Sequence, residues 1–164
     1  NVWFMEARQA PLITLTFVTA EGSGSDKPAK AGATSFMVDM LDEGAGQLDA
    51  LALSDAFQLL ATDYAGSAET DALTFSLNML ADKLEPSLAL LSDILRKPTF
   101  PAPEFERRKA QRLASALTAE ANLGRTASVV RKRVLFGQGY GAFGSAGVRD
   151  TLKAVTLEDL KARY

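Results

Sequence analysis

Three acidic residues that lie close together are the first candidates for chemistry in this sequence: Asp39, Asp42 and Glu43. Carboxylates are preferred ligands of hard cations such as Ca²⁺, so the cluster is compatible with a metal site. The sequence places no further ligand beside it, and a helix end in water would carry the same residues. We interpret the cluster as a solvated helix end and keep a carboxylate metal site as the alternative.

Nucleophilic catalysis lacks its usual residues. The 164 residues include no Cys and no His. This excludes disulfides, thiol catalysis, zinc-thiolate sites and the Ser-His-Asp triad. Ser35 is a conceivable nucleophile, but no His exists to activate it and no Lys lies at helical spacing from it. We therefore expect no nucleophile here.

Two further segments carry charge or glycine in unusual density. Residues 137–147 contain five glycines but lack the Lys and the strand-loop-helix order of a phosphate-binding loop, so we interpret them as a loop. A basic run is interpreted as a solvated helix surface, with an interface to an acidic partner or to peptide carboxylates as the alternative. Its members are Arg107, Arg108, Lys109 and Arg112, continued by Arg125, Arg131, Lys132 and Arg133.

Composition is that of a globular domain with one core. About half of the residues are apolar, and the net charge is −2 with a pI near 5.2. This balance gives no electrostatic reason to expect nucleic acid as a partner. The longest apolar stretches are too short and too interrupted to span a bilayer. The chain starts without Met, and we interpret it as a piece of a longer precursor.

The first half of the chain alternates strand and helix patterns. We expect strands at residues 2–5, 12–20, 64–69 and 73–77, with a hairpin joint at 69–71. Helices are expected at residues 32–42, ended by Gly44 or Gly46, and at 48–60. Trp3 and Phe4 are expected to pack in the core or against another segment.

The second half is helical. Residues 84–96 carry one leucine stripe and end before Pro98, and Pro103 opens a helix that continues, with a break near Gly124, to residue 136. Thr156 and Asp159 have the spacing of a capping box for a last helix. The order of elements predicts an α+β fold in two layers, with an antiparallel or mixed sheet and helices packed on one face.

Residues 31–44, AGATSFMVDMLDEG, resemble the motif helix of the M16 peptidases, the pitrilysin- and insulinase-like inverted zincins. That family reads A-G-x-x-H-F-x-E-H-M-x-x-x-G, in which two His bind zinc and the Glu serves as general base. By this resemblance, the first His position is Ser35, the Glu position is Val38 and the second His position is Asp39. The fold implied is the LuxS/MPP-like metallohydrolase fold.

The resemblance extends over nearly the whole chain. Residues 91–100 are similar to the family's L-x-D-x-L-x-x-P-x-F segment, 139–141 to its P-Y-G turn, and 147–156 to its approach to the last helix. The family's next helix carries two acids, and these positions fall on Arg108 and Ser115. The second of them is the third zinc ligand in active members. Ser115 follows Asp39 by 76 residues, which is the family's usual gap.

These departures imply a non-catalytic domain. Ser35, Val38, Asp39 and Ser115 leave one carboxylate where an active site needs three ligands and a base, so we expect no catalytic residue, no metal and no cofactor in this chain. Zinc is expected only in a partner. The resemblance implies a domain that pairs with an active M16 subunit, or with the second half of its own chain, and helps to bind or enclose an extended peptide.

Two alternatives stay open. One is a structural scaffold subunit of a larger complex with no role in proteolysis. The other is an enzyme whose H-x-x-E-H motif lies in another half of the same polypeptide. We expect residues 1–164 to form a single M16-like domain, the N-terminal half of a longer two-domain protein. By resemblance to bacterial members the expected location is the periplasm, with the cytoplasm as the alternative.

Overall fold

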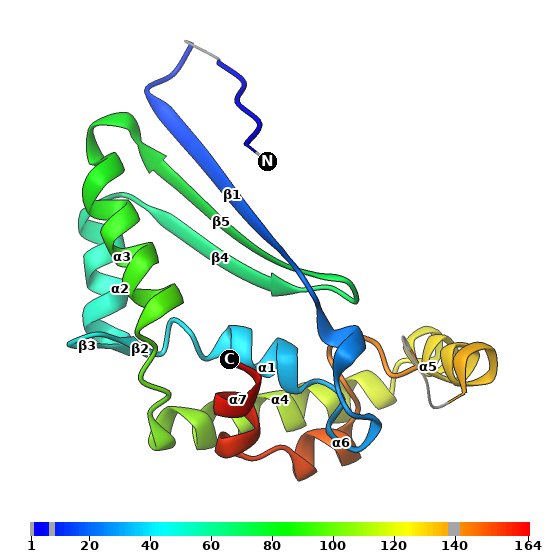
Figure 1. Ribbon diagram of the computed structural model, residues 1–164. Helices are drawn as coiled ribbons and strands as arrows, with labels where there is room; N and C mark the ends of the chain where they lie inside the picture. Colours follow the sequence, from blue (N-terminus) through cyan, green and yellow to red (C-terminus); the bar gives the residue numbers. More distant parts are fainter. Residues whose placement is uncertain (1, 7–8, 138–141) are drawn as a thin grey trace.

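A computed structural model describes residues 2–6, 9–137 and 142–164. Within those ranges it contains a three-stranded sheet, a hairpin of two short strands with two residues each, and seven α-helices (Figure 1). The elements in chain order are β1 (Leu12–Ala20), α1 (Ala33–Asp39), β2 (Gly44–Ala45), β3 (Leu48–Asp49), α2 (Ala50–Leu59), β4 (Asp63–Ala68), β5 (Ala72–Leu80), α3 (Leu84–Arg96), α4 (Ala102–Glu120), α5 (Leu123–Phe136), α6 (Arg149–Ala154) and α7 (Leu157–Arg163). Single 3₁₀ turns lie at Ser23–Ser25, Pro28–Lys30 and Ala81–Lys83.

The main sheet is antiparallel, with strand order β1-β5-β4. Phe17 lies opposite Phe75, and Leu15 lies opposite Leu77. Alternation along β5 sends Phe75 and Leu77 to one face, where both are buried. The strand expected at 73–77 is therefore confirmed and extends to Leu80, and the hairpin joint at 69–71 is confirmed as well.

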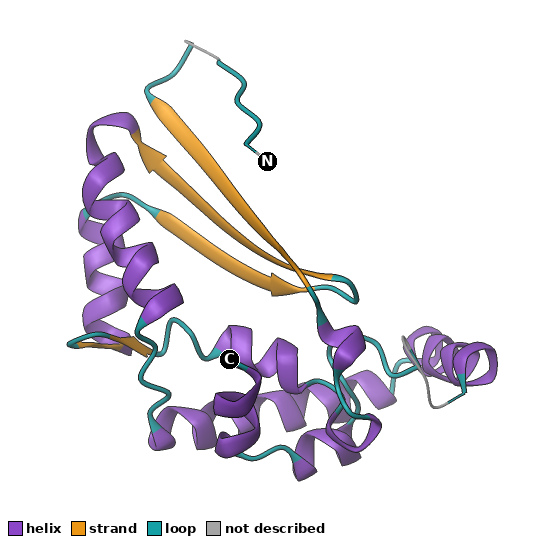
Figure 2. Ribbon diagram, in the orientation of Figure 1, coloured by secondary structure: helices purple, strands orange, loops and turns teal. Residues whose placement is uncertain are grey.

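Helices cover one face of this sheet, as Figure 2 shows. α1 packs against β4, α2 contacts β4, and α3 contacts β5. The α+β architecture with an antiparallel sheet and helices on one face is confirmed. β1, at the sheet edge, keeps Leu15 and Phe17 partly exposed.

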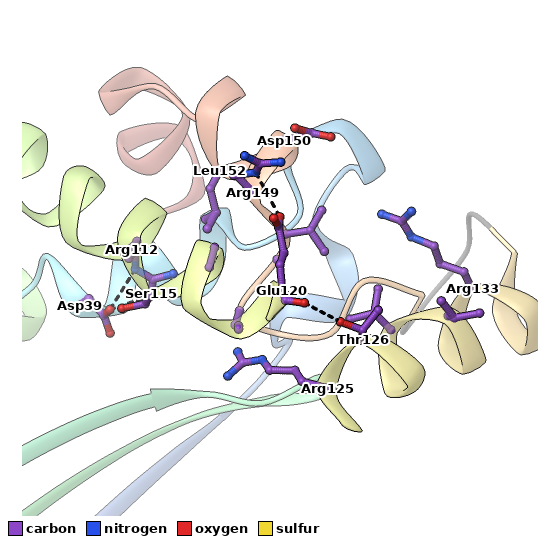
Figure 3. Close-up of a pocket in the computed structure, with 17 residues that line it drawn as sticks. Asp39, Arg112, Ser115, Glu120, Arg125, Thr126, Arg133, Arg149, Asp150 and Leu152 are labelled. Carbon is purple, nitrogen blue, oxygen red and sulfur yellow. Dashed lines mark hydrogen bonds and ion pairs between the residues drawn. The ribbon is translucent and has the colours of Figure 1, made fainter. Parts of the chain in front are cut away.

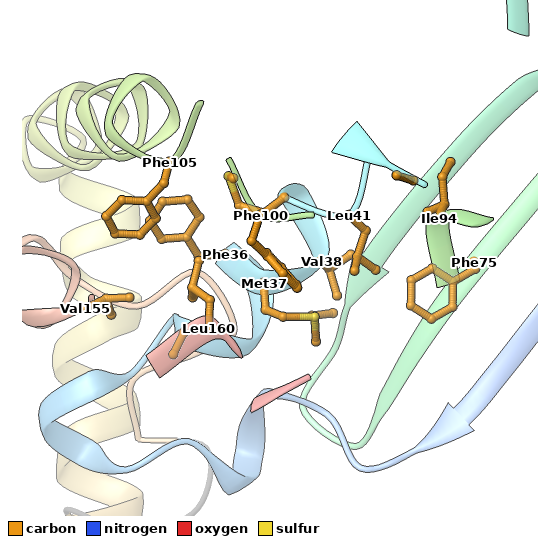
Figure 4. Close-up of a cluster of buried hydrophobic side chains, with 14 of the residues drawn as sticks. Phe36, Met37, Val38, Leu41, Phe75, Ile94, Phe100, Phe105, Val155 and Leu160 are labelled. Atoms are coloured by element: carbon orange, nitrogen blue, oxygen red, sulfur yellow. The ribbon is translucent and has the colours of Figure 1, made fainter. Parts of the chain in front are cut away.

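The core joins α1 to the sheet on one side and to α4 and α7 on the other (Figure 4). Phe36 on α1 stacks on Phe105 of α4 with ring centroids 5.1 Å apart. Val155 and Leu160, near and on α7, complete this side, and both are fully buried. Burying side chains of this size contributes about 1.5 to 3 kcal/mol each. Because α1 packs on both sides, it is the central element of the core.

Local signals placed several helices correctly. α3 has the predicted bounds, and α4 opens at the prolines near residue 103. At the start of α7, the Thr156 hydroxyl accepts a hydrogen bond from the Asp159 amide, and the Asp159 carboxylate accepts one from the Thr156 amide. The predicted capping box is confirmed.

Other expectations were wrong. Residues 2–5 form no strand, because no described strand pairs with this segment, and Trp3 and Phe4 are exposed and so do not pack in the core. Their packing against a segment missing from this chain stays a prediction. α1 ends at Asp39 and not at 42, and Gly44 begins β2 instead of capping the helix. α6 was not predicted. The family-like segment 139–141 lies outside the described residues.

Candidate functional site

The start of α1 is held by side chains from two other segments. The carboxylate of Asp26 accepts hydrogen bonds from the amides of Gly32, at 2.9 Å, and Thr34, at 3.2 Å. These are amides that a helix start leaves without partners, so Asp26 acts as a cap from the preceding loop. Arg163 on α7 donates through Nε to the Thr34 hydroxyl at 2.7 Å. The motif helix therefore has a fixed position.

Two glycines let a second segment cross this helix start. Gly32 and Gly147 both have positive φ, at 96° and 70°. A Cβ on Gly32 would lie 2.8 Å from the Ala146 carbonyl oxygen, and a Cβ on Gly147 would collide with the Ala31 carbonyl. Only glycine fits both the dihedrals and the spacing. The crossing places residues 146–148 beside the motif helix.

Val38, at the Glu position of the resemblance, lies in the core. It is 2 % exposed, and its Cγ1 would be 2.9 Å from a Cβ on Gly66 of β4. The absence of a side chain at Gly66 is what permits this close contact between α1 and the sheet. An aliphatic side chain in this position contributes packing and has no group that can take a proton.

Ser35 and Asp39, one helical turn apart on α1, both contact Arg112 of α4. Arg112 Nη2 donates to Asp39 Oδ2 at 2.6 Å and to Ser35 Oγ at 2.8 Å, and its Nε lies 3.0 Å from the same Asp39 oxygen. The guanidinium carbon is 5.0 Å from the Phe36 ring. The two His positions of the resemblance thus share one arginine.

Ser115, at the third ligand position, follows Arg112 by one turn of α4 and is exposed. With Asp39 and Arg112 it lines a cavity of about 460 Å³ between α4, α5 and the start of α6 (Figure 3). Small apolar side chains line part of it, among them Ala116, Ala119 and Val129. The structure therefore brings Ser35, Asp39 and Ser115 together around Arg112, whereas Val38 turns toward the sheet.

Charged side chains line the rest of the cavity. Arg149 pairs with Glu120 at 3.1 Å, as Figure 3 shows. Arg133 lies 5.1 Å from the ring of Phe143. The side chain of Arg125 has no ion-pair or hydrogen-bond partner among the described residues. The lining therefore combines small apolar side chains with charged side chains of both signs.

The acidic cluster is not a solvated helix end. Glu43, with 3 % of its side chain exposed, accepts from Arg107 Nη2 at 2.6 Å and from Arg108 Nε. Burial raises the pKa of Asp42 above its usual value, partly opposed by the nearby Arg108. Asp39 is paired with Arg112 as described. Two acids of the cluster, Asp39 and Glu43, therefore pair with three arginines of the basic run, Arg107, Arg108 and Arg112, which neither sequence interpretation proposed.

The residues at the motif positions do not fit a catalytic zinc. A zinc hydrolase site needs three nitrogen, sulfur or oxygen ligands and an open position. Among residues 2–6, 9–137 and 142–164, no three His, Cys, Asp or Glu side chains gather in a metal-binding arrangement. The one carboxylate at the motif, Asp39, already accepts hydrogen bonds from a guanidinium. No reaction step through a metal follows from this donor set.

Comparison with known proteins agrees with this geometry. The profile of the insulinase family, peptidase family M16, matches residues 3–135. The chain belongs to the M16 peptidase family. Within that family it is 26 % identical over 143 residues to the "Non-peptidase homolog YmxG" of Helicobacter pylori (strain ATCC 700392 / 26695), covering 87 % of this chain and 33 % of that protein.

Solved M16 structures share the fold. The crystal structure of a peptidase M16 inactive domain from Pseudomonas fluorescens is 35 % identical, with a TM-score of 0.89 over 96 % of this chain and 39 % of that one. Pitrilysin is 20 % identical with a TM-score of 0.77, covering 94 % of this chain and 17 % of its own, and shows the fold alone. This M16 chain spans between a third and two fifths of the length of the first two relatives.

Sequence reasoning assigned the motif positions by resemblance but missed what surrounds them. Arg112 was assigned to a solvated surface, and Glu43 to a helix end. Arg112 lies 73 residues from Asp39 in the chain, so no local pattern links them. The one available signal was the position of Arg112, one helical turn before Ser115 on the helix that carries the third ligand in active members.

Proposed function

We propose that this chain is a non-catalytic M16 domain that pairs with an active zinc peptidase subunit and helps to bind or enclose its peptide substrate. The observation that carries the proposal is the Arg112 contact with Ser35 and Asp39, because it fills the face of α1 where active members hold their metal. Relatives described as a non-peptidase homolog and as an inactive domain support the same reading.

Exposed apolar side chains support a large interface with another protein body. Clusters of exposed apolar side chains mark surfaces that another protein can cover. This chain exposes large apolar side chains on the N-terminal segment, on β1 and on α5, and they include Trp3, Phe4, Phe17, Val18, Val134 and Leu135. Either an active subunit or the second half of a longer chain is suited to cover them. We propose that residues 1–164 are the N-terminal half of such a two-domain protein.

The cavity beside the motif supports a role in peptide binding. Its volume, about 460 Å³, lies in the range of ligand pockets, and its lining of apolar and charged side chains suits a peptide side chain. It borders Asp39 and Ser115, the positions of the second and third zinc ligands in active members by the resemblance. We propose that one peptide side chain enters it while zinc in the partner performs the cleavage.

Reconstitution with an active subunit tests the pairing. The full-length protein would be combined with the M16 subunit of its own organism that carries H-x-x-E-H, and peptide cleavage would be measured for each alone and for the pair. We expect no cleavage by this protein alone and faster cleavage by the pair than by the active subunit. The matched control is a pair whose active subunit has its motif Glu changed to Gln.

A scaffold role predicts a different result. The protein would then assemble stably into a complex, and no partner's cleavage rate would change. Cleavage by this protein alone, with one zinc per chain, would contradict both roles.

The peptide contact has its own test in Ala119→Trp, which fills the cavity from α4. We expect the variant to pair normally while its pair shows a raised KM for peptide. Ala114→Trp, on an exposed position of the same helix outside the cavity, is the matched control. An unchanged KM for Ala119→Trp would remove the cavity from the peptide-binding surface.

The proposed location is the periplasm, where many bacterial M16 proteins are expected by the resemblance, and fractionation of cells with antibody detection tests it. Within the described residues, no helix combines the length and the apolar character needed to cross a membrane.

A further inference from the structure

We infer that Arg112 supplies an internal cation in place of the metal, so that this site is closed to zinc twice: by lost ligands and by a built-in positive charge. This goes beyond the proposed function, since it holds whether or not the chain pairs with another subunit. The guanidinium lies within hydrogen-bond distance of both positions on α1 that hold His in active members, at 2.6 Å from Asp39 and 2.8 Å from Ser35.

The position of the guanidinium is defined by the core and not by solvent. The Arg112 side chain is 15 % exposed. It lies over the ring of Phe36. Phe36 in turn stacks on Phe105, which lies on α4 about two turns before Arg112. The aromatic pair fixes α4 against α1, and the cation-π contact fixes the guanidinium between them. Arg112 is therefore held where a ligand-bound ion would lie between the two helices.

A fixed positive charge at this position opposes metal binding even when ligands are present. Two like charges a few ångströms apart repel strongly in a partly buried site. Arg112 also precedes position 115 by three residues on α4, the spacing at which Arg and Glu pair on one helix face. A Glu introduced at position 115 would therefore form an ion pair with the Arg112 guanidinium, and this ion pair would compete with metal binding.

The inference predicts that restoring ligands alone is insufficient. Two variants of the full-length protein would be compared: Ser35→His/Asp39→His/Ser115→Glu, and the same three changes with Arg112→Leu. Leucine keeps an apolar side chain over Phe36 and removes the charge. Zinc affinity would be measured by competition with a chromophoric chelator, and folding by circular dichroism. We expect the variant with Arg112→Leu to bind one zinc per chain at least about tenfold more tightly.

The matched control adds Arg131→Leu to the three restored ligands. It removes the same charge from an exposed position of α5 that does not line the cavity. Its zinc affinity should equal that of the three-ligand variant. Equal affinities with and without Arg112, including failure of both variants to bind zinc, would overturn the inference.

A measurement on the native site keeps the inference testable if the restored variants do not fold. Arg112→Gln, Asp39→Asn and the double variant would be unfolded in urea. If the guanidinium holds α1 to α4 through Asp39, the double variant loses less stability than the two single losses combined. Strictly additive losses would contradict the internal-cation role.

Discussion

Two carboxylate–arginine contacts join the end of α1 to α4, and they differ in burial. Glu43 has 3 % of its side chain exposed and accepts from both Arg107 and Arg108. Asp39 has 41 % of its side chain exposed and accepts from Arg112 alone. We call these the Glu43 ion pair and the Asp39 ion pair.

The comparison shows that the same chemistry serves two purposes in one interface. A buried carboxylate must be fully paired, because an unpaired buried charge is strongly destabilising. The Glu43 ion pair is thus part of the packing of the fold. The Asp39 ion pair lies at the rim of a cavity in contact with water, where its strength is lower and depends on salt. The Asp39 ion pair differs in its position, because it lies on the face of α1 that carries Ser35 and Asp39.

The largest expected effect comes from Glu43→Gln. The variant replaces a buried carboxylate, which accepts charge-assisted hydrogen bonds from the partly exposed Arg107 and Arg108, by a neutral amide, and we expect a loss of about 2 to 3 kcal/mol in the free energy of unfolding. Urea titration followed by circular dichroism measures it. Glu104→Gln is the control, since Glu104 contacts the same Arg107 from an exposed position and should change stability little. Equal losses in the free energy of unfolding for the two variants would show that burial does not make the Glu43 ion pair more important for stability.

Asp39→Asn should cost less, about 1 kcal/mol or below at low salt, because 41 % of the Asp39 side chain is exposed to solvent. Repeating the urea titration in 1 M sodium chloride should shrink this loss, since the Debye length falls to about 3 Å. The Glu43→Gln loss should persist in the same salt. A salt-independent Asp39→Asn loss would show that the two ion pairs are alike.

Tyr64 shows whether a buried neutral group also needs a hydrogen-bond partner. Its hydroxyl is buried and has no hydrogen-bond partner among the described residues. Burial, with Asp42 and Asp39 nearby, raises the pKa of this phenol above its ordinary value. Removing an unpaired buried hydroxyl should be neutral or stabilising, by up to about 1 kcal/mol for Tyr64→Phe in thermal unfolding. Tyr164→Phe is the control and should destabilise slightly, because that hydroxyl donates to the Leu95 carbonyl.

The smallest effect concerns a third contact, in which both side chains are partly exposed. Lys30 lies 2.6 Å from Asp159, and its hydrogen bond holds the pKa of Asp159 below the usual value. The contribution to stability is therefore present above the unfolded pKa of about 4 and is lost as the pH falls through the folded one. Asp159→Asn should lower stability slightly at neutral pH and flatten its decline in acid. An unchanged pH profile of unfolding would contradict this assignment.

Local patterns predicted the elements whose signals lie within a few residues. The alternation in β1 and β5, the leucine stripe of α3 and the capping box of α7 each depend on neighbouring positions. α6 lacked such a signal, and the end of α1 was set by the turn that leads into β2. Likewise, the N-terminal segment has strand-like residues but no described strand to pair with.

The sequence by itself determined the family and, by resemblance, assigned the motif positions, because these follow from residue identity and from spacing along the chain. Only the tertiary structure decided that Glu43 pairs with Arg107 and Arg108, and that Arg112 contacts both Ser35 and Asp39. Those contacts join residues more than 60 positions apart. Their geometry depends on the packing of Phe36 against Phe105, which no local pattern encodes.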